Sequence, residues 1–172
     1  MQQGRTSQRW QQERDSEVQA ELVRLRGASD TQLRASDSEQ ATRRIAWYQT
    51  VRDAVKESKP LETAYRVLLC RLGIHEDEAP VVKRDDTSIT FHSMNFCPTL
   101  EACRILGLDT RRVCRFNESS TDALVRQVDP KLTFSRNYKK IRPYSEFCEE
   151  SISYKSEAER HLSNNHQTKK LN

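Results

Sequence analysis

Three of the five cysteines lie where expected helices and strands begin or end, next to polar residues: Cys97, Cys114 and Cys148. Cys97 precedes a helix that should begin at Pro98, and a helix N-terminus favours the thiolate form of cysteine. A shared site could therefore hold a nucleophilic thiol or a zinc-like divalent metal. No two cysteines have the two-residue gap of a zinc knuckle, so a metal would need ligands from separate elements. The alternative is that all three are small buried side chains.

The other two cysteines are predicted to lie in the hydrophobic core. Cys103 follows Cys97 by six residues, so on a helix its side chain points about 240° away. It continues the apolar face formed by Leu100 and Leu106. Cys70 lies on the apolar face of another expected helix. Neither is expected to share a site with Cys97.

A histidine and two carboxylates near these cysteines are candidates for proton transfer. His92 ends a strand-like run ahead of Cys97, where it could act as a base or a ligand, or form a surface hydrogen bond. Glu149 and Glu150 follow Cys148 on a predicted strand, so at most one of them faces the interior. Burial would raise the pKa of that carboxyl group and suit it to acid–base catalysis. We take Glu149 and His92 as candidate proton carriers, with solvated carboxylates as the alternative.

Arg142 is the best candidate for binding a substrate. Its neighbours Ile141 and Pro143 restrict it, and a restricted guanidinium is suited to a bidentate contact with a carboxylate. Glu101 is a second candidate contact, although the helix dipole alone explains a carboxylate in the first turn of a helix. Phosphate or RNA is the alternative target for the basic residues, but aromatic residues do not alternate with them as base stacking requires. We therefore expect a small-molecule ligand ahead of a nucleic acid.

The length and composition indicate one domain without a membrane-spanning segment. The chain has 172 residues and a net charge of +4, which is too mild to indicate a dedicated nucleic-acid-binding protein. No apolar run approaches about 20 residues, and the N-terminus leads into Gln and Arg instead of an apolar signal. An odd number of cysteines favours reduced thiols. These features predict a cytoplasmic location and no membrane partner.

Helical patterns dominate the first half of the chain. Val18, Leu22 and Leu25 predict a short helix stopped by Gly27, followed by a polar linker over residues 28–35. A second helix should begin at Ser36 or Ser38 and run to about residue 57. A third is expected over residues 61–72, with Pro60 in its first turn and Gly73 as its C-cap.

Strands and short helices are predicted in the second half. The expected elements are a hairpin of residues 81–84 and 87–91 around Asp85-Asp86, a helix from Pro98 to Gly107, a helical turn over residues 109–114, a helix over residues 120–128 capped by Ser119 or Ser120, and a strand pair of residues 132–134 and 147–154.

The predicted fold class is α+β, with N-terminal helices packed on a small antiparallel sheet and short helices between the strand pairs. Residues 1–37 are expected to form a flexible arm with a short helix. Residues 38–155 should form a single α+β domain, and residues 156–172 a polar tail.

Several motifs between Ile89 and Tyr154 resemble those of L-2-amino-thiazoline-4-carboxylic acid hydrolase-like proteins, and distantly those of small-ligand domains of the 4-vinyl-reductase type. The motifs are Asn95-Phe96-Cys97-Pro98, Glu101-Ala102-Cys103, Gly107-Leu108, Cys114, Asp129-Pro130-Lys131-Leu132 with Phe134, and Cys148-Glu149-Glu150. The resemblance implies an α+β domain that opens a thiazoline ring with water to give an N-carbamoyl cysteine. It also implies that Cys97, Cys114 and Cys148 occupy family positions. The chain departs from the family where Tyr144-Ser145-Glu146-Phe147 replaces the Gly and Asp that often precede the last cysteine.

Three functional hypotheses follow, and the third, a nucleic-acid accessory protein that uses the arginines and the two ends of the chain, ranks well behind the other two. In the first, the protein hydrolyses a small cyclic amidine or amide, with Cys97 as nucleophile or metal ligand, Glu149 or His92 as proton carrier, and Arg142 as carboxylate clamp. In the second, the same pocket belongs to a non-catalytic domain that senses a small ligand or a metal.

Overall fold

The structure is a computed structural model that describes residues 7–155, with side chains described from residue 11 onwards. The predicted polar tail, residues 156–172, lies outside the described residues. The helices are α1 (Ser7–Leu25), α2 (Asp30–Val51), α3 (Pro60–Leu72), α4 (Pro98–Leu106) and α5 (Thr110–Val128), with a 3-10 turn at Glu76–Glu78. The strands are β1 (Val81–Arg84), β2 (Ser88–Ser93), β3 (Leu132–Arg136) and β4 (Cys148–Tyr154). The predicted α+β class is confirmed.

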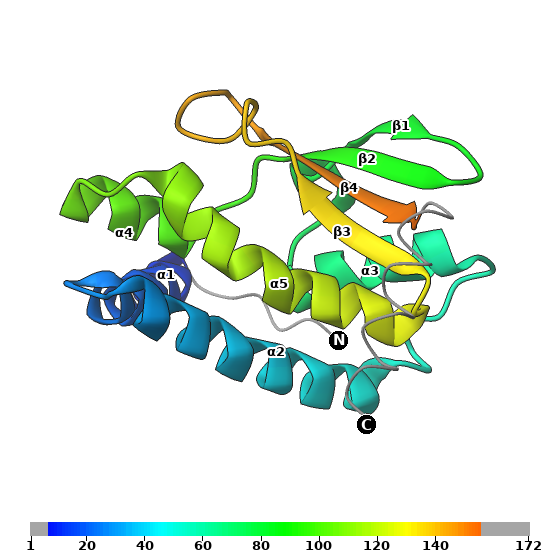
Figure 1. Ribbon diagram of the computed structural model, residues 1–172, viewed down its shortest axis with the longest axis horizontal. Coiled ribbons are helices and arrows are strands. Elements are labelled where there is room, and N and C mark those ends of the chain that lie inside the picture. Colours follow the sequence, from blue (N-terminus) through cyan, green and yellow to red (C-terminus); the bar gives the residue numbers. More distant parts are fainter. Residues whose placement is uncertain (1–6, 156–172) are drawn as a thin grey trace, which may run out of the picture.

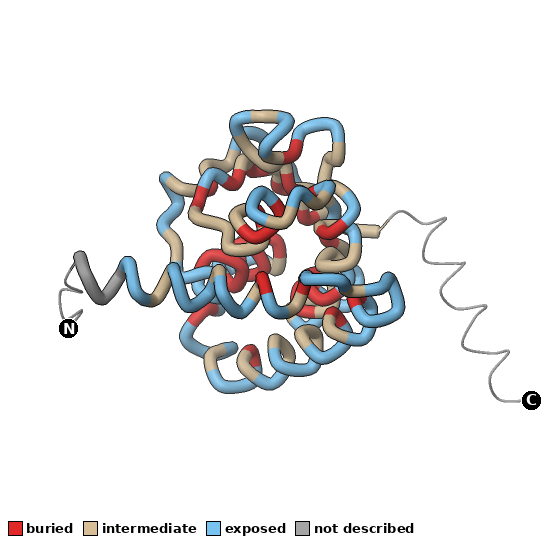
Figure 2. The backbone as a smooth tube through the Cα atoms, turned by 90° about the vertical axis from the view of Figure 1, so that its left-hand side faces the viewer, coloured by how far each residue is buried: buried red, intermediate tan, exposed pale blue. Residues whose placement is uncertain are grey.

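The four strands form one antiparallel sheet in the order β1-β2-β4-β3. Helices α3 and α5 lie against one face of the sheet, and α2 runs along α5 on the side away from the sheet (Figure 1). Buried residues gather between these layers (Figure 2). The main core cluster includes Leu61, Val67, Ile89, Leu124, Leu132 and Ile152. The inner face of the sheet is therefore apolar along most of its length.

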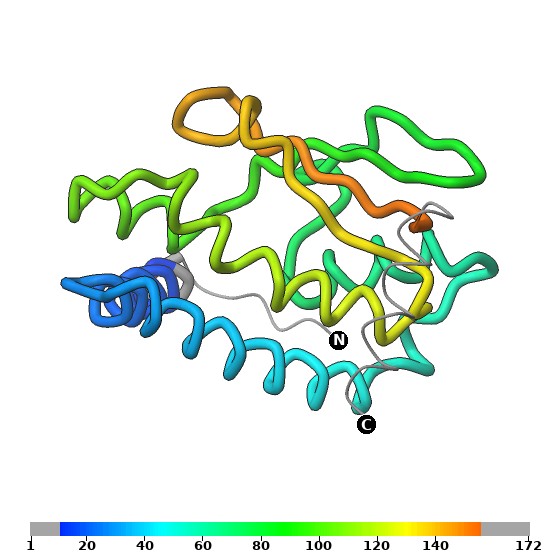
Figure 3. The backbone as a smooth tube through the Cα atoms, viewed as in Figure 1, coloured from blue at the N-terminus to red at the C-terminus, as the bar shows by residue number. Residues whose placement is uncertain are grey.

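The loop between β3 and β4, residues 137–147, arcs over the end of the sheet towards the first half of α5 (Figure 3). Two hydrogen bonds fix it there. Arg111 donates through Nε to the Tyr138 carbonyl at 3.1 Å, and the Tyr144 hydroxyl lies 3.1 Å from Asp109. The Arg111 guanidinium also lies 3.7 Å from the centroid of the Tyr144 ring. Arg142 lies in this loop, at the end of the sheet.

Local turn signals predicted several boundaries correctly. Asp85 accepts the backbone N–H groups of Thr87 at 2.8 Å and Ser88 at 2.9 Å, which closes the β1–β2 hairpin. Helix α4 begins at Pro98 and ends at Gly107, whose φ of 64° is the left-handed conformation that favours glycine. These contacts are local in sequence, so the sequence was sufficient to predict them.

The start of α2 was predicted wrongly. The helix begins at Asp30, and its N-cap is Ser29, which forms a capping box with Gln32. The residues predicted as a linker, 28–35, therefore belong mostly to α2, and Leu33 is only 2% exposed. The proposed boundary between residues 37 and 38 falls inside this helix.

Helix α1 packs on the rest of the protein. Leu22 and Leu25 pack with Leu33 of α2 and with Ala102 and Cys103 of α4 in a second core cluster. The predicted short helix is thus longer, and it packs on the rest of the protein through Val18, Leu22 and Leu25. None of the helices between residues 7 and 155 is long and apolar enough to cross a membrane.

The two predicted helices over residues 109–114 and 120–128 are a single helix, α5. Ser119 and Ser120 do not cap a helix, because they lie inside α5, where both contact Asp37 of α2. The Ser119 hydroxyl donates to Asp37, and the Ser120 backbone N–H lies 3.3 Å from the same carboxylate. Asp37 is buried. The two serines predicted as helix caps therefore make a long-range contact between α5 and α2 instead.

The capping box predicts a difference between two serines of α2. Replacing Ser29 with alanine removes the side-chain acceptor for Gln32 N, so the free energy of unfolding should fall by about 1 kcal/mol. Ser38→Ala is the matched control, because its side chain is exposed inside the helix and should change stability by less than about 0.5 kcal/mol. Urea unfolding measures both. Equal losses would show that Ser29 is not the cap.

Candidate ligand pocket

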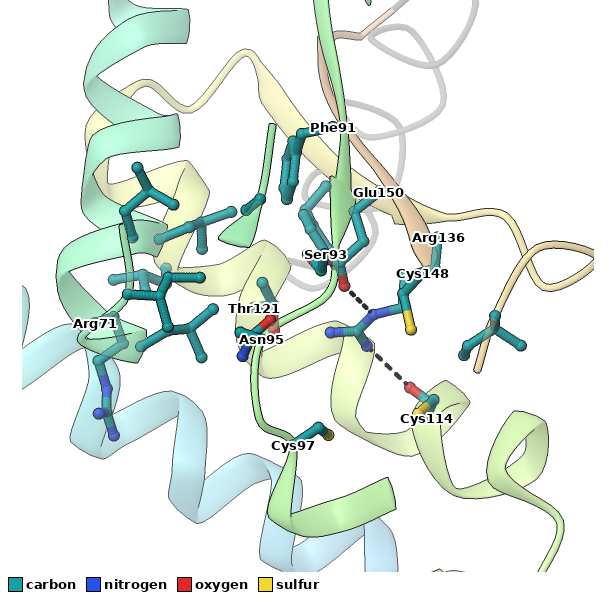
Figure 4. A pocket seen from close by; sticks show the side chains of 18 of the residues that line it. Arg71, Phe91, Ser93, Asn95, Cys97, Cys114, Thr121, Arg136, Cys148 and Glu150 are labelled. Carbon is teal, nitrogen blue, oxygen red and sulfur yellow. Dashed lines mark hydrogen bonds and ion pairs between the residues drawn. The ribbon is translucent and has the colours of Figure 1, made fainter. Parts of the chain in front are cut away.

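A cavity of about 130 Å³ lies between the inner face of the sheet, α3, α5 and the segment that leads into α4. Its lining divides into an apolar part and a charged, polar part. The apolar part includes Leu68, Leu69, Phe91, Leu124, Phe134 and Ile141. Figure 4 shows the polar part, where residues from β2, β3, β4 and α5 meet. The cavity is therefore amphipathic.

Cys97, Cys114 and Cys148 all line this cavity. Cys97 is the N-cap of α4, Cys114 lies in the second turn of α5, and Cys148 is the first residue of β4 (Figure 4). The turns thus bring three thiols that are far apart in sequence to one cavity. Cys103 is buried between α1 and α4 as predicted, whereas Cys70 was predicted in the core and is exposed.

The buried thiols are held in the neutral form. Burial raises the pKa of Cys97, and the Leu100 N–H at 3.4 Å and the nearby Arg142 offset this effect only in part. Burial likewise raises the pKa of Cys114 to about 12, against the opposing influence of Arg136. The thiolate predicted at Cys97 from the helix dipole is therefore not favoured, because desolvation outweighs the dipole.

Sharing a cavity does not make the three thiols a metal site. Within residues 7–155, no three His, Cys, Asp or Glu side chains are arranged to hold a metal ion. The Arg136 guanidinium also lies on the side of the cavity that carries the three cysteines (Figure 4). Its positive charge would repel a divalent cation. The zinc-like ion expected at Cys97, Cys114 and Cys148 therefore has no preformed site.

A buried ion pair joins Arg136 and Glu150 at the polar end of the cavity. Arg136 Nε lies 2.6 Å from Glu150 Oε1, and the Ser93 hydroxyl donates to Glu150 Oε2 at 2.7 Å. Arg136 Nη1 also donates to the Cys114 carbonyl at 3.3 Å. Burial acts most strongly, to lower the pKa of Arg136, but Glu150 and Cys114 act together in the opposite direction, and the net effect raises this pKa above its usual value.

His92 and Glu149, the predicted proton carriers, lie on the opposite face of the sheet from the cavity. His92 Nε2 is 3.3 Å from Glu149 Oε2, and its ring stacks on Phe147 with centroids 3.6 Å apart. Glu149 also accepts from Lys140 and Asn137, each at 2.8 Å. These contacts, led by Lys140, lower the pKa of Glu149 to about 2. Neither residue can transfer a proton inside the cavity.

Glu150 lines the cavity in place of Glu149, which the sequence had suggested. The alternation along β4 predicts correctly that the two glutamates lie on opposite faces, but it does not indicate which face is internal. In the structure, Arg136 pairs with Glu150 across β3 and β4, and His92 pairs with Glu149 across β2 and β4. If Arg136 and Glu150 had both been assigned to the inner face of their strands, their opposite charges would have predicted this ion pair.

Arg142 lines the cavity as expected, whereas Glu101 does not. Arg142 Nη1 donates to the Met94 carbonyl at 3.2 Å, while its buried Nε has no hydrogen-bond partner among the described residues. Glu101 lies on the surface of α4, where it pairs with Arg104 at 3.5 Å. Its predicted contact with a substrate is therefore not made in this cavity, which Glu101 does not line.

Positive charge exceeds negative charge in the cavity. Arginines 44, 71, 136 and 142 line it together with a single carboxylate, Glu150. Arg44 comes from α2, and its Nη1 donates to the Thr121 hydroxyl at 2.6 Å. Burial, followed by the nearby Arg71 and Arg136, lowers the pKa of Arg44 to about 10. An environment that opposes a cation in this way favours an anionic ligand.

The ion pair predicts unequal effects of two neighbouring substitutions. Glu150→Gln leaves the Arg136 charge buried without its partner, which should lower the free energy of unfolding by about 3–5 kcal/mol. Glu149→Gln, the control, breaks contacts on the outer face and should cost less than about 1 kcal/mol. Chemical denaturation measures both. A larger loss for Glu149→Gln would contradict the assignment of the inner face.

Comparison of the chain with protein-family models, curated proteins and solved structures gave no match. The function is therefore argued from the geometry of the cavity.

Proposed function

We propose that the cavity binds a small organic acid, with its carboxylate at Arg142 and its apolar body against the leucine and phenylalanine side chains. The observation that carries this proposal is the lining of four arginines with one carboxylate. A buried guanidinium without a counter-ion is costly, so a ligand that supplies negative charge gains binding energy there.

Arg142 is the residue with unused hydrogen-bonding capacity. A guanidinium has five N–H donors in a planar fork, and Arg142 directs Nη1 to the Met94 carbonyl while its buried Nε makes no hydrogen bond within the described chain. A carboxylate can accept from Nε and a terminal N–H group together. A carboxylate that reaches Nε would satisfy the donor that the described part of the protein leaves unpaired.

Arg136 has a different role in the proposed site. Glu150 already neutralises its charge, and the Cys114 carbonyl accepts from Nη1. Its remaining N–H groups can still donate to a ligand oxygen, but the pair as a whole brings no net charge. Arg136 therefore orients the ligand, while Arg142 supplies the attraction.

The size of the cavity restricts the ligand to a small molecule. Its volume of about 130 Å³ is close to that of engineered cavities that hold one benzene ring. The apolar lining contributes roughly 25 cal/mol for each Å² of ligand surface that it removes from water. A carboxylic acid with a ring or a chain of about six carbons fits both the volume and the lining.

Calorimetric titration with hexanoate and benzoate tests the proposal. Both should bind, whereas the neutral hexanamide should bind at least about tenfold more weakly, because a hydrogen bond to a charged group contributes about 1.5–3 kcal/mol. Arg142→Gln should weaken hexanoate binding by about tenfold or more. Arg142→Lys should restore only part of it, since an ammonium group lacks the planar fork.

Arg104→Gln is the control, because Arg104 is exposed on α4 outside the cavity and should leave hexanoate binding unchanged. If neither acid binds, or if Arg142→Gln has no effect on their binding, the proposal is wrong.

Hydrolysis of a thiazoline carboxylate, which the sequence resemblance implies, is a second candidate. The supporting observation is that Cys97 lines the cavity beside Arg142, where a carboxylate substrate would be held. In the reaction, water adds at the ring carbon between nitrogen and sulfur and the carbon–sulfur bond breaks. The products are a free thiol and a carbamoyl group on nitrogen. Glu150 is the carboxylate that could carry the proton, in place of His92 and Glu149.

Incubation with L-2-amino-thiazoline-4-carboxylate tests this candidate. Chromatography should detect N-carbamoyl cysteine with the wild-type protein and none with Cys97→Ser. Cys70→Ser is the control, since Cys70 is exposed outside the cavity and its loss should not affect turnover. If the wild-type protein forms no product while hexanoate binds, the cavity binds ligands without hydrolysing this compound.

A further inference from the structure

We infer that the natural ligand carries a second anionic group, held by Arg44, and is therefore a dicarboxylic acid. The inference rests on the proposed binding of an organic acid at Arg142, and it specifies the class of that acid. Its basis is that the cavity has a second guanidinium, that of Arg44 on helix α2, whose charge the described part of the protein leaves without an ion-pair partner.

The contacts of Arg44 are all with neutral groups. Nη1 donates to the Thr121 hydroxyl at 2.6 Å, and Nη2 lies 3.5 Å from the Gln40 side-chain oxygen. No salt bridge joins Arg44 to any carboxylate in the described part of the chain. The guanidinium is thus hydrogen-bonded but not neutralised.

The two carboxylates that influence Arg44 are engaged elsewhere. Asp37 accepts from Ser119 and Ser120 of α5. Glu150 is held by Arg136 and Ser93. Both favour the charged form of Arg44, but burial and the repulsion from Arg71 and Arg136 have larger effects and lower its pKa to about 10. A bound anion would supply the missing countercharge.

The guanidinium groups of Arg136 and Arg44 contact α5 at different positions. Arg136 is tied to the Cys114 carbonyl, and Arg44 is tied to the Thr121 side chain. Seven residues of α-helix separate these two contacts, which is a rise of about 10 Å. Arg142 lies at the Cys114 end, because it interacts electrostatically with Cys97 and its backbone N–H contacts the Cys148 sulfur. One ligand with two separated carboxylates can therefore contact Arg142 and Arg44 together.

Arg44 could instead be a purely structural link between α2 and α5. In that case its replacement would destabilise the unliganded protein and would not change which acids bind. If Arg44 instead binds a ligand carboxylate, its replacement should not destabilise the unliganded protein and should change which acids bind. The reason is that an unpaired buried charge opposes folding and favours the binding of an anion.

The first measurement compares acids of equal length by calorimetry. Hexanoate and adipate have the same carbon chain, and so do pentanoate and glutarate; they differ only in the second carboxylate. At least one dicarboxylate should bind about tenfold or more tightly than its matched monocarboxylate, as expected for one added charged hydrogen-bonded contact. If every matched pair binds equally, the inference is wrong while the proposed function stands. If no acid binds, both are wrong.

The second measurement uses Arg44→Gln. This variant should bring the affinity ratio of adipate to hexanoate close to one, whereas Arg142→Gln should weaken both acids. The control is Arg43→Gln, which removes the neighbouring arginine of α2 that is 65% exposed and pairs with Glu39, and it should preserve the ratio. A ratio unchanged in Arg44→Gln would overturn the assignment.

The third measurement is the denaturation midpoint without ligand. Arg44→Gln should unfold at the same urea concentration as the wild type or a higher one, since it removes a charge that lacks a partner. Adipate should raise the midpoint of the wild type more than that of the variant. A clear loss of stability in the unliganded variant would show that Arg44 is structural and would contradict the inference.

Discussion

The ion pair between Arg136 and Glu150 is the interaction on which the cavity depends. It crosses from β3 to β4, reaches β2 through Ser93, and reaches α5 through the Cys114 carbonyl. A one-residue slip of β4 would exchange the two faces of that strand and place Glu149 inside. Since a buried charge without its partner is strongly destabilising, this pair fixes the register of the strands that form the polar wall.

The cavity also contains two arginines, Arg44 and Arg142, whose charges are not compensated in this way. Arg136 is fully compensated, but Arg44 and Arg142 retain guanidinium groups without a carboxylate partner within residues 7–155. The cavity thiols cannot compensate them, because burial keeps Cys97 and Cys114 neutral. Natural proteins retain such destabilising features mainly where function requires them. The excess of positive charge is therefore better explained by a ligand than by folding.

The sequence was sufficient for features that depend on neighbouring residues and insufficient for those that depend on distant ones. The fold class, the Asp85 turn and the two ends of α4 follow from local turn and capping residues. Ser119 and Ser120 instead lie inside the continuous helix α5 and contact Asp37, about 80 residues away, which no local pattern indicates. The site shows the same limit: alternation separated Glu149 from Glu150, but only the pairing with β3 decides which one is internal.

In both candidate functions Arg142 binds the carboxylate of the ligand. As a binding residue it is neutralised by the ligand carboxylate, which removes one of the positive charges that lower the pKa of Cys97. A bound acid should therefore keep Cys97 as a thiol. A nucleophilic Cys97 would need another proton acceptor, and Glu150 is already held by Arg136 and Ser93. His92 and Glu149 cannot help from the opposite face of the sheet. The geometry thus favours a cavity that recognises an acid by its charge over one that attacks it with a thiolate.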